Sequence, residues 1–167
     1  DVVNPYRFGV QVLTEMAVGR TKVSVFKEAV ERNIPAPAVQ AFIKDVCKEV
    51  GFFDRYIENE KPDLIIVATD TVDSQRIANT LAIRYGIPAL FVALSDRAES
   101  GQIEYVSGKK DEPCHLCLTH TENPDNSPIK LKSTNEQYRI NAAVEQQAVP
   151  ALSVDIGIIS DIAAKLA

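Results

Sequence analysis

The sequence predicts an α/β fold with a doubly wound, mostly parallel sheet. Its clearest element spans residues 63–70, where five consecutive apolar residues, three of them β-branched, are typical of a strand buried on both faces. Apolar residues at helical spacing follow this strand, and residues 87–94 then form a second, nearly continuous apolar strand. Strands that alternate with helices predict a sheet with helices packed on both of its faces.

Upstream of this first strand, the sequence predicts three helices and one strand. Apolar residues recur at helical spacing over residues 12–16 and 23–30, and the aromatic residues of 52–57 predict a short third helix. Residues 38–46 alternate well enough between apolar and polar side chains to favour a strand. Residues 1–9 resemble a turn that leaves an earlier strand, so we expect the domain to be incomplete at its N-terminus.

Downstream of the strand, a helix with Ile77 and Leu81 on its buried side is expected to end at Gly86, because glycine is favoured just past a helix C-terminus. The remaining segments are, in order, an antiparallel strand over 102–107, a long polar connection over 114–134, and helices over 135–147 and 153–166. Residues 1–167 are therefore predicted to form one domain, which is a size that can bury a hydrophobic core.

The composition is that of a globular protein without a nucleic-acid or membrane partner. Hydrophobic residues make up 46% of the chain and charged residues 25%, and the net charge of −5 disfavours a basic face for nucleic acid or anionic lipid. No apolar run approaches the roughly 18 residues that a membrane-spanning helix needs. Three cysteines are too few for a disulfide framework, which favours a reducing, cytoplasmic location. Cys47 has apolar neighbours and is expected to be a buried filler.

The other two cysteines form the motif Cys114-x-x-Cys117. This spacing predicts two ligands of a structural Zn²⁺ site, which takes four ligands in tetrahedral geometry. His115 or His120 could donate in addition, or a second cysteine pair could follow residue 167. The alternatives to zinc are a thiol pair that binds no metal and a redox-active pair.

Asp70 ends the strand of residues 63–70 and is the strongest candidate for a ligand contact. In doubly wound sheets, ligands bind beyond the carboxyl ends of the strands. A simpler interpretation is that Asp70 only caps the next helix, because aspartate is favoured at that position. The glycine-rich G-x-G-x-x-G turn that would indicate a nucleotide site does not occur in the sequence. The chain therefore either lacks the unit that carries this turn or binds no nucleotide.

Six short motifs lie in order along the first 118 residues. They are Val18-Gly19-Arg20-Thr21-Lys22-Val23, Pro62 to Asp70, Arg76 with Asn79, Gly86-Ile87-Pro88, Gly101-Gln102-Ile103, and Glu112 to Leu118. In order and spacing they resemble the ThiF/MoeB adenylyltransferases, which are relatives of the ubiquitin-activating enzymes. The resemblance implies a Rossmann-like, ThiF-type fold, of which residues 1–167 would be a part without the glycine-rich ATP loop and the C-terminal tail.

The resemblance also implies an activity and a set of site residues. Members of this family use ATP and Mg²⁺ to adenylate the C-terminal carboxylate of a ubiquitin-like or sulfur-carrier protein, and they are usually homodimers. Asp70 would coordinate Mg²⁺, Lys22 would contact the phosphates, and Arg76 and Asn79 would contact the nucleotide or the tail of the partner. The polar connection after Cys117 would guide that tail. Lys22, Arg76 and Asn79 each also have a simpler interpretation, as solvated or structural residues of a helix.

The N-terminal segment departs from the family's motif, which reads approximately D-x-V-E-x-x-N-x-x-R-Q. Laid without gaps on residues 1–11, this motif places Arg7 at its asparagine position and Val10 at its arginine position. Arg7 would then lie about one helical turn from the usual arginine and could replace it as a phosphate contact. The change supports an alternative function, a non-catalytic module that binds a ubiquitin-like partner or mediates dimerisation. Residues 1–167 by themselves are expected to be inactive.

Overall fold

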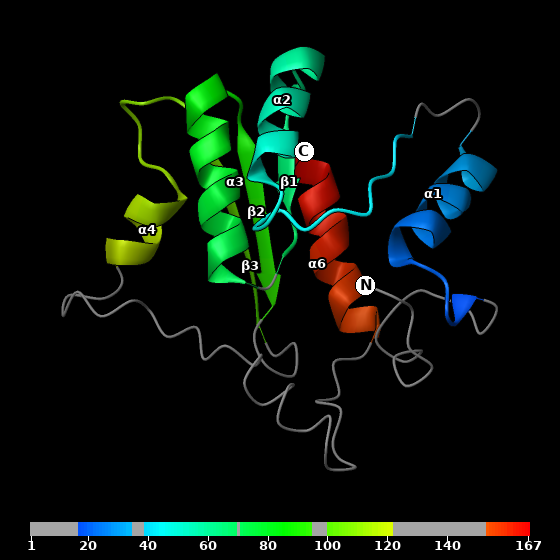
Figure 1. The fold of residues 1–167 in the computed structure, drawn as a ribbon. Coiled ribbons are helices and arrows are strands. Elements are labelled where there is room, and N and C mark those ends of the chain that lie inside the picture. Colours follow the sequence, from blue (N-terminus) through cyan, green and yellow to red (C-terminus); the bar gives the residue numbers. More distant parts are fainter. Residues whose placement is uncertain (1–16, 35–38, 70, 95–99, 122–152) are drawn as a thin grey trace, which may run out of the picture.

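The computed structural model describes residues 17–34, 39–69, 71–94, 100–121 and 153–167 (Figure 1). The elements within these ranges are, in chain order, α1 (Lys22–Asn33), α2 (Val50–Glu60), β1 (Ile65–Val67), α3 (Val72–Tyr85), β2 (Ala89–Leu94), β3 (Gly101–Val106), α4 (His115–Thr121) and α6 (Ser153–Leu166). None of the helices described is long and apolar enough to cross a membrane.

The described sheet has three strands in the order β1-β2-β3. Strands β1 and β2 are parallel, with Ile66 opposite Leu90, and α3 connects them. Strand β3 is antiparallel to β2, so that Tyr105 lies opposite Leu90. The antiparallel strand predicted at 102–107 is confirmed, and the described part of the fold is a mixed α/β structure with a partly parallel sheet.

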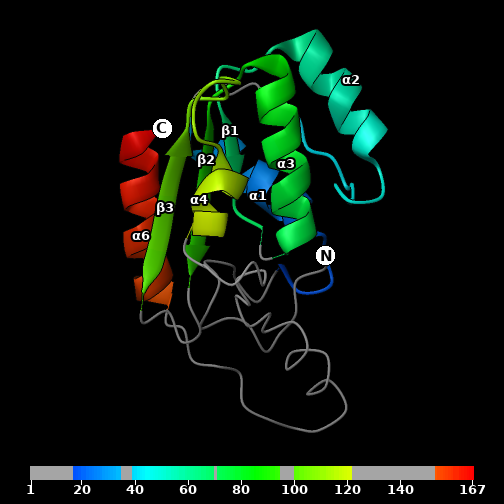
Figure 2. The ribbon, with the colours of Figure 1, turned by 90° about the vertical axis from the view of Figure 1, so that its left-hand side faces the viewer.

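Helices cover both faces of this sheet, as the alternation of strands and helices predicts (Figure 2). Helix α6 packs on one face, against β2 and β3. Helix α3 packs on the other face, against β1 and β2, and carries α2 and α4 as neighbours. The core between α3 and the sheet contains five buried residues, Val67, Ala82, Ala89, Phe91 and Val106. Leu90, which lies between Ala89 and Phe91 in the sequence, is also fully buried. Because side chains alternate along a strand, Leu90 points to the opposite face of the sheet, which α6 covers.

Local signals explain the two helices that flank this core. Thr71 caps the N-terminus of α3, where its side-chain oxygen accepts a hydrogen bond from the backbone N–H of Ser74. Gly86 ends α3 with a φ of 67°, in the left-handed conformation that its sequence position predicts. Helix α6 has the predicted bounds of 153–166. It approaches β3 at Gly101, where the side chain of Ile159 occupies the space that a Cβ atom would need.

Helix α1 confirms the helix predicted over residues 23–30, with Thr21 as its N-cap. It has no buried residue, and the ring of Phe26 on its apolar side is 51% exposed. Figure 1 shows α1 apart from the three strands. Its sequence periodicity therefore determines a helix but does not place that helix on the described core.

Four predictions from the sequence are wrong. Residues 39–45 are not a strand, because none of the described strands pairs with them, and the turn at 46–48 follows. Cys47 is exposed rather than buried, and it lies in the turn at 46–48, where its backbone N–H donates a hydrogen bond of 2.9 Å to the carboxylate of Asp45.

The other two wrong predictions concern the strand expected over residues 63–70 and the connection expected over residues 114–134. The strand expected over residues 63–70 is regular only from Ile65 to Val67. Ile66 is 57% exposed, because α6, the described helix on its face of the sheet, packs mainly against β2 and β3. The polar connection expected at 114–134 begins with α4, a short helix without an apolar stripe to reveal it. The helices predicted over 12–16 and 135–147 lie outside the described residues.

Two glycine substitutions test how the backbone conformation at Gly86 and at Gly157 contributes to the stability of α3 and α6. Gly86→Ala is expected to lower the free energy of unfolding by about 1 kcal/mol, because a side chain is strained at positive φ. Gly157→Ala, inside α6, is expected to raise it by about 0.5–1 kcal/mol, because alanine favours the helical backbone. Among the described residues no atom lies within 4 Å of either added Cβ, so packing does not contribute. Urea unfolding should give changes of opposite sign, and two losses of similar size would contradict the explanation.

Candidate functional site

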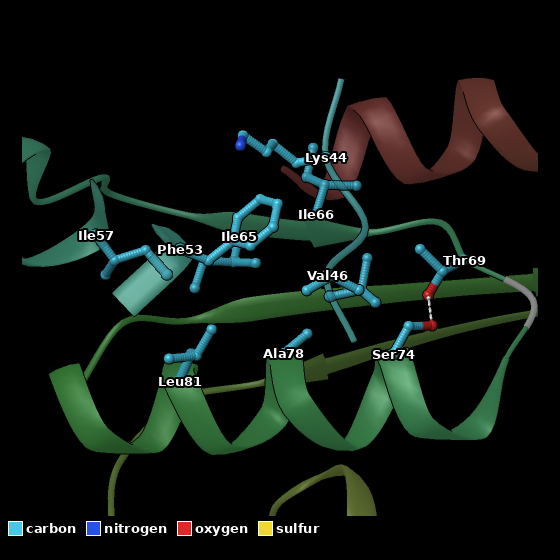
Figure 3. A pocket seen from close by; sticks show the side chains of 11 residues that line it. Lys44, Val46, Phe53, Ile57, Ile65, Ile66, Thr69, Ser74, Ala78 and Leu81 are labelled. Atoms are coloured by element: carbon cyan, nitrogen blue, oxygen red, sulfur yellow. Dashed lines mark hydrogen bonds between the residues drawn. The ribbon is translucent and has the colours of Figure 1, made fainter. Parts of the chain in front are cut away.

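The carboxyl end of β1 is tied to the first turn of α3 by a set of short polar contacts. The Oγ atom of Ser74 lies 2.6 Å from Oγ1 of Thr69 (Figure 3). The side-chain amide of Gln75 also donates a hydrogen bond of 2.9 Å to the carbonyl of Thr69. Ser74 and Gln75 are both buried. Asp70 lies outside the described residues, but its chain neighbours Thr69 and Thr71 are held by these contacts and by the N-cap of α3.

A cavity of about 320 Å³ lies beside this junction, between β1, α2, α3 and the segment around residue 44 (Figure 3). Its lining is mainly apolar, with Ile65 and Leu81 among the residues that form it. Thr69 and Ser74 are the polar residues at one end, and Lys44 is the charged residue of the lining. The ammonium of Lys44 is paired with Glu49 at 2.5 Å. The chemistry of the cavity is therefore suited to apolar groups rather than to phosphates.

The structure does not gather all the residues predicted from the sequence. Lys22 is the first residue of α1, which stands apart from the strands (Figure 1), so its contact with phosphate stays a prediction. Arg76 is exposed on α3, where its carbonyl accepts a hydrogen bond from the hydroxyl of Thr80. Arg7, like Asp70, lies outside the described residues.

Asn79 lies on α3 under the cysteine motif, not at the exposed end of the strand. Its side chain is 1% exposed. Oδ1 accepts a hydrogen bond of 3.1 Å from the backbone N–H of His115, and Nδ2 donates to Sγ of Cys114 at 3.5 Å. The amide thus anchors the start of α4 on α3, which is the structural role that the sequence left open for it.

The two thiols of the motif face each other, with 3.5 Å between Sγ of Cys114 and Sγ of Cys117. Cys114 is half-buried and Cys117 is exposed. Burial favours the neutral thiol of Cys114, but hydrogen bonds from the backbone of Cys117 and from the Asn79 amide outweigh it, so the pKa of Cys114 is lowered from its usual value. Two thiols are half of a structural zinc site, and no cluster of three or more His, Cys, Asp or Glu side chains within the described ranges could hold a metal.

His115, between the two cysteines, is turned into the fold. Its Nδ1 lies 3.0 Å from Oε2 of Glu104, and both side chains are buried. Its ring stacks on Phe91, with the centroids 4.1 Å apart and the planes 5° from parallel. Oε1 of Glu104 has no hydrogen-bond partner in the described part of the chain. His115 therefore supports α4 from beneath instead of joining the two thiols.

Sequence reasoning missed Glu104, although a signal was present. Residues two apart on a strand share a face, so Glu104 and the apolar Val106 lie on the same side of β3. A carboxylate on a buried face needs a partner, because an isolated buried charge is strongly disfavoured. His115 is the partner, and only the packing of α4 on the sheet brings the two together.

Comparison with known proteins agrees with this architecture. Residues 1–165 match the ThiF family. The crystal structure of SeMet PaaA shares the fold, with a TM-score of 0.59 and 16% sequence identity. The match covers 99% of this chain and 53% of that chain, so the present chain spans about half the length of PaaA. No curated protein matches this sequence.

Proposed function

Since the chain belongs to the ThiF family, within the superfamily of E1-like adenylyltransferases, we propose that the whole protein activates a carboxylate as an acyl adenylate. The substrate we propose is the C-terminal carboxylate of a ubiquitin-like or sulfur-carrier protein, with ATP and Mg²⁺ as the other reactants. The observation that carries the proposal is the family match over residues 1–165. The order of β1, Asp70 and α3 supports it, because ligands of doubly wound sheets bind beyond the carboxyl ends of parallel strands.

The chemistry assigned to the residues follows from their charge. The carboxylate of Asp70 is a hard oxygen ligand of the kind that Mg²⁺ prefers, so this residue fits the ion, while the hydroxyls of Thr69 and Thr71 are engaged with Ser74. Bound Mg²⁺ would neutralise charge on the triphosphate. Lys22 and Arg7 would stabilise the negative charge that develops as the partner's carboxylate oxygen attacks the α-phosphorus and pyrophosphate leaves. The products are the acyl adenylate of the partner and pyrophosphate.

Exchange of labelled pyrophosphate into ATP by the full-length protein tests this function. Exchange should depend on a carrier protein with a free C-terminal carboxylate, because the reverse reaction requires the acyl adenylate. The matched control is the same carrier with its C-terminus amidated, which should support none. If the free carrier binds but supports no exchange, the non-catalytic binding module is the better assignment. The altered arginine position at Val10 is the sequence feature that favours this second function.

A further inference from the structure

Two consecutive buried side chains of α3, Ser74 and Gln75, hold the residues that precede and follow Asp70 in the sequence. The hydroxyl oxygen of Ser74 lies 2.6 Å from Oγ1 of Thr69 and 2.7 Å from Oγ1 of Thr71. The side-chain amide of Gln75 donates to the carbonyl of Thr69 at 2.9 Å. We propose that Gln75, supported by Ser74, is a positioning residue that fixes the backbone from which the Asp70 carboxylate meets Mg²⁺. This inference rests on the proposed function.

Gln75 occupies a helix position where packing alone favours an apolar side chain. It is 7% exposed, and it lies three and seven residues before Ala78 and Ala82, which pack in the core between α3 and the sheet. Glutamine is mostly exposed in proteins, because its burial costs side-chain entropy and hydration. The hydrogen bond to Thr69 offsets part of this cost. What the amide adds over an apolar side chain is therefore a fixed position for the Thr69 carbonyl.

The pairing of the strands does not extend as far as Thr69. The described ladder between β1 and β2 ends at Val67, two residues before Thr69. Beyond that point, hydrogen bonds from another element have to fix the backbone, because strand pairing no longer does. Ser74 and Gln75 supply such bonds from the first turn of α3. The end of β1 is thus fixed to the helix that follows it.

A fixed backbone at this place bears directly on metal binding. Protein sites for Mg²⁺ require nearly ideal octahedral geometry, so a carboxylate ligand must be presented within a narrow range of positions. A ligand on a freely moving backbone loses conformational freedom when the ion binds, and this loss weakens the affinity. By holding the chain neighbours of Asp70, Gln75 and Ser74 reduce that loss. Their role is to orient a ligand, and neither residue needs to touch the ion or the nucleotide.

Gln75→Met in the full-length protein tests this role. Methionine has a similar length and fills the buried site, but it cannot donate a hydrogen bond to the carbonyl of Thr69. Calorimetry should show that ATP binds about five- to tenfold more weakly in Mg²⁺, which corresponds to the loss of one hydrogen bond. Binding of ATP in EDTA should be unchanged, because no metal is then available to Asp70. Pyrophosphate exchange should need more Mg²⁺ to reach half of an unchanged maximal rate.

Tyr85→Phe is the matched control. Tyr85 lies at the other end of α3, where its hydroxyl donates to the carboxylate of Asp54 at 2.9 Å, so this substitution also removes one hydrogen bond from the helix. Urea unfolding measures the stability that each variant loses, and circular dichroism establishes that both are folded. Binding of ATP in Mg²⁺ should be unchanged in Tyr85→Phe. Equal weakening in Tyr85→Phe and Gln75→Met would mean that helix stability explains the effect, which would overturn the inference.

A double-mutant cycle with Asp70→Asn separates positioning from other roles of Gln75. If Gln75 acts through Asp70, Gln75→Met should change ATP binding in Mg²⁺ by less than about twofold once the carboxylate is absent. An equal effect of Gln75→Met with and without the carboxylate, or equal weakening in Mg²⁺ and in EDTA, would overturn the inference and leave the proposed function intact. An unaltered protein that binds no ATP in Mg²⁺ would overturn both.

Discussion

Replacing Asp70 with asparagine in the full-length protein is expected to lower the rate of ATP–pyrophosphate exchange by about two to three orders of magnitude. The amide has nearly the size of the carboxylate but no charge, so it is a weak ligand for Mg²⁺ and stabilises the transferring phosphate poorly. The loss should therefore appear in the rate at saturating ATP, and added Mg²⁺ should restore part of it. Exchange of labelled pyrophosphate at several Mg²⁺ concentrations measures both effects.

Asp73 provides the matched control for this substitution. It lies in the first turn of α3, three residues after Asp70, and its side chain is exposed. Asp73→Asn removes the same charge from the same helix N-terminus, where a negative charge contributes well under 1 kcal/mol at an exposed position. Exchange by this variant should stay within about twofold of the unaltered protein. Equal losses in the two variants would mean that helix stability, and not metal coordination, explains the effect.

The second large effect is expected at the buried pair of Glu104 and His115. His115→Phe keeps an aromatic ring on Phe91 and keeps the backbone N–H that binds Asn79. It removes the partner of the Glu104 carboxylate, whose other oxygen already has none among the described residues. An uncompensated buried carboxylate should lower the free energy of unfolding by about 3 kcal/mol. Urea unfolding followed by circular dichroism measures the change.

The double variant Glu104→Leu with His115→Phe makes this prediction specific. It replaces the pair by apolar side chains of similar size, and such replacements are often neutral or stabilising. It should therefore recover most of the stability that His115→Phe loses. Tyr105→Phe, at the exposed neighbouring position of β3, is the control and should change the free energy of unfolding by less than about 0.5 kcal/mol. A double variant that is less stable than His115→Phe would contradict the pairing.

Elements with strong local signals were predicted from the sequence, and those without such signals were not. Helix α3 has an N-cap at Thr71 and a glycine at its C-terminus, and helix α6 has an apolar sequence with the predicted bounds. The segment 39–45 alternates like a strand, yet a strand exists only where a neighbour accepts its hydrogen bonds. Helix α4 is short and polar, so its packing on α3 stabilises it more than its own sequence does.

For the candidate site, the sequence by itself determined what depends on neighbours along the chain. It identified Asp70 as the residue that ends an apolar strand, and it placed Cys114 and Cys117 at a spacing that allows two sulfur atoms to meet. Lys22 and Arg7 rest on family motifs alone and stay predictions. The same sequence could not show that the residues around Asp70 would be tied to the first turn of α3 through Thr69.

Only the tertiary structure decided the contacts beneath the cysteine pair. Asn79 and Cys114 are 35 residues apart in sequence, and Glu104 and His115 belong to a strand and a helix that meet across the sheet face. Such contacts depend on the register of β2 with β3 and on the packing of α3, which no local spacing encodes. The sequence thus determines the helices with strong signals and the reactive groups, whereas burial against distant partners determines that Asn79, Glu104 and His115 act together.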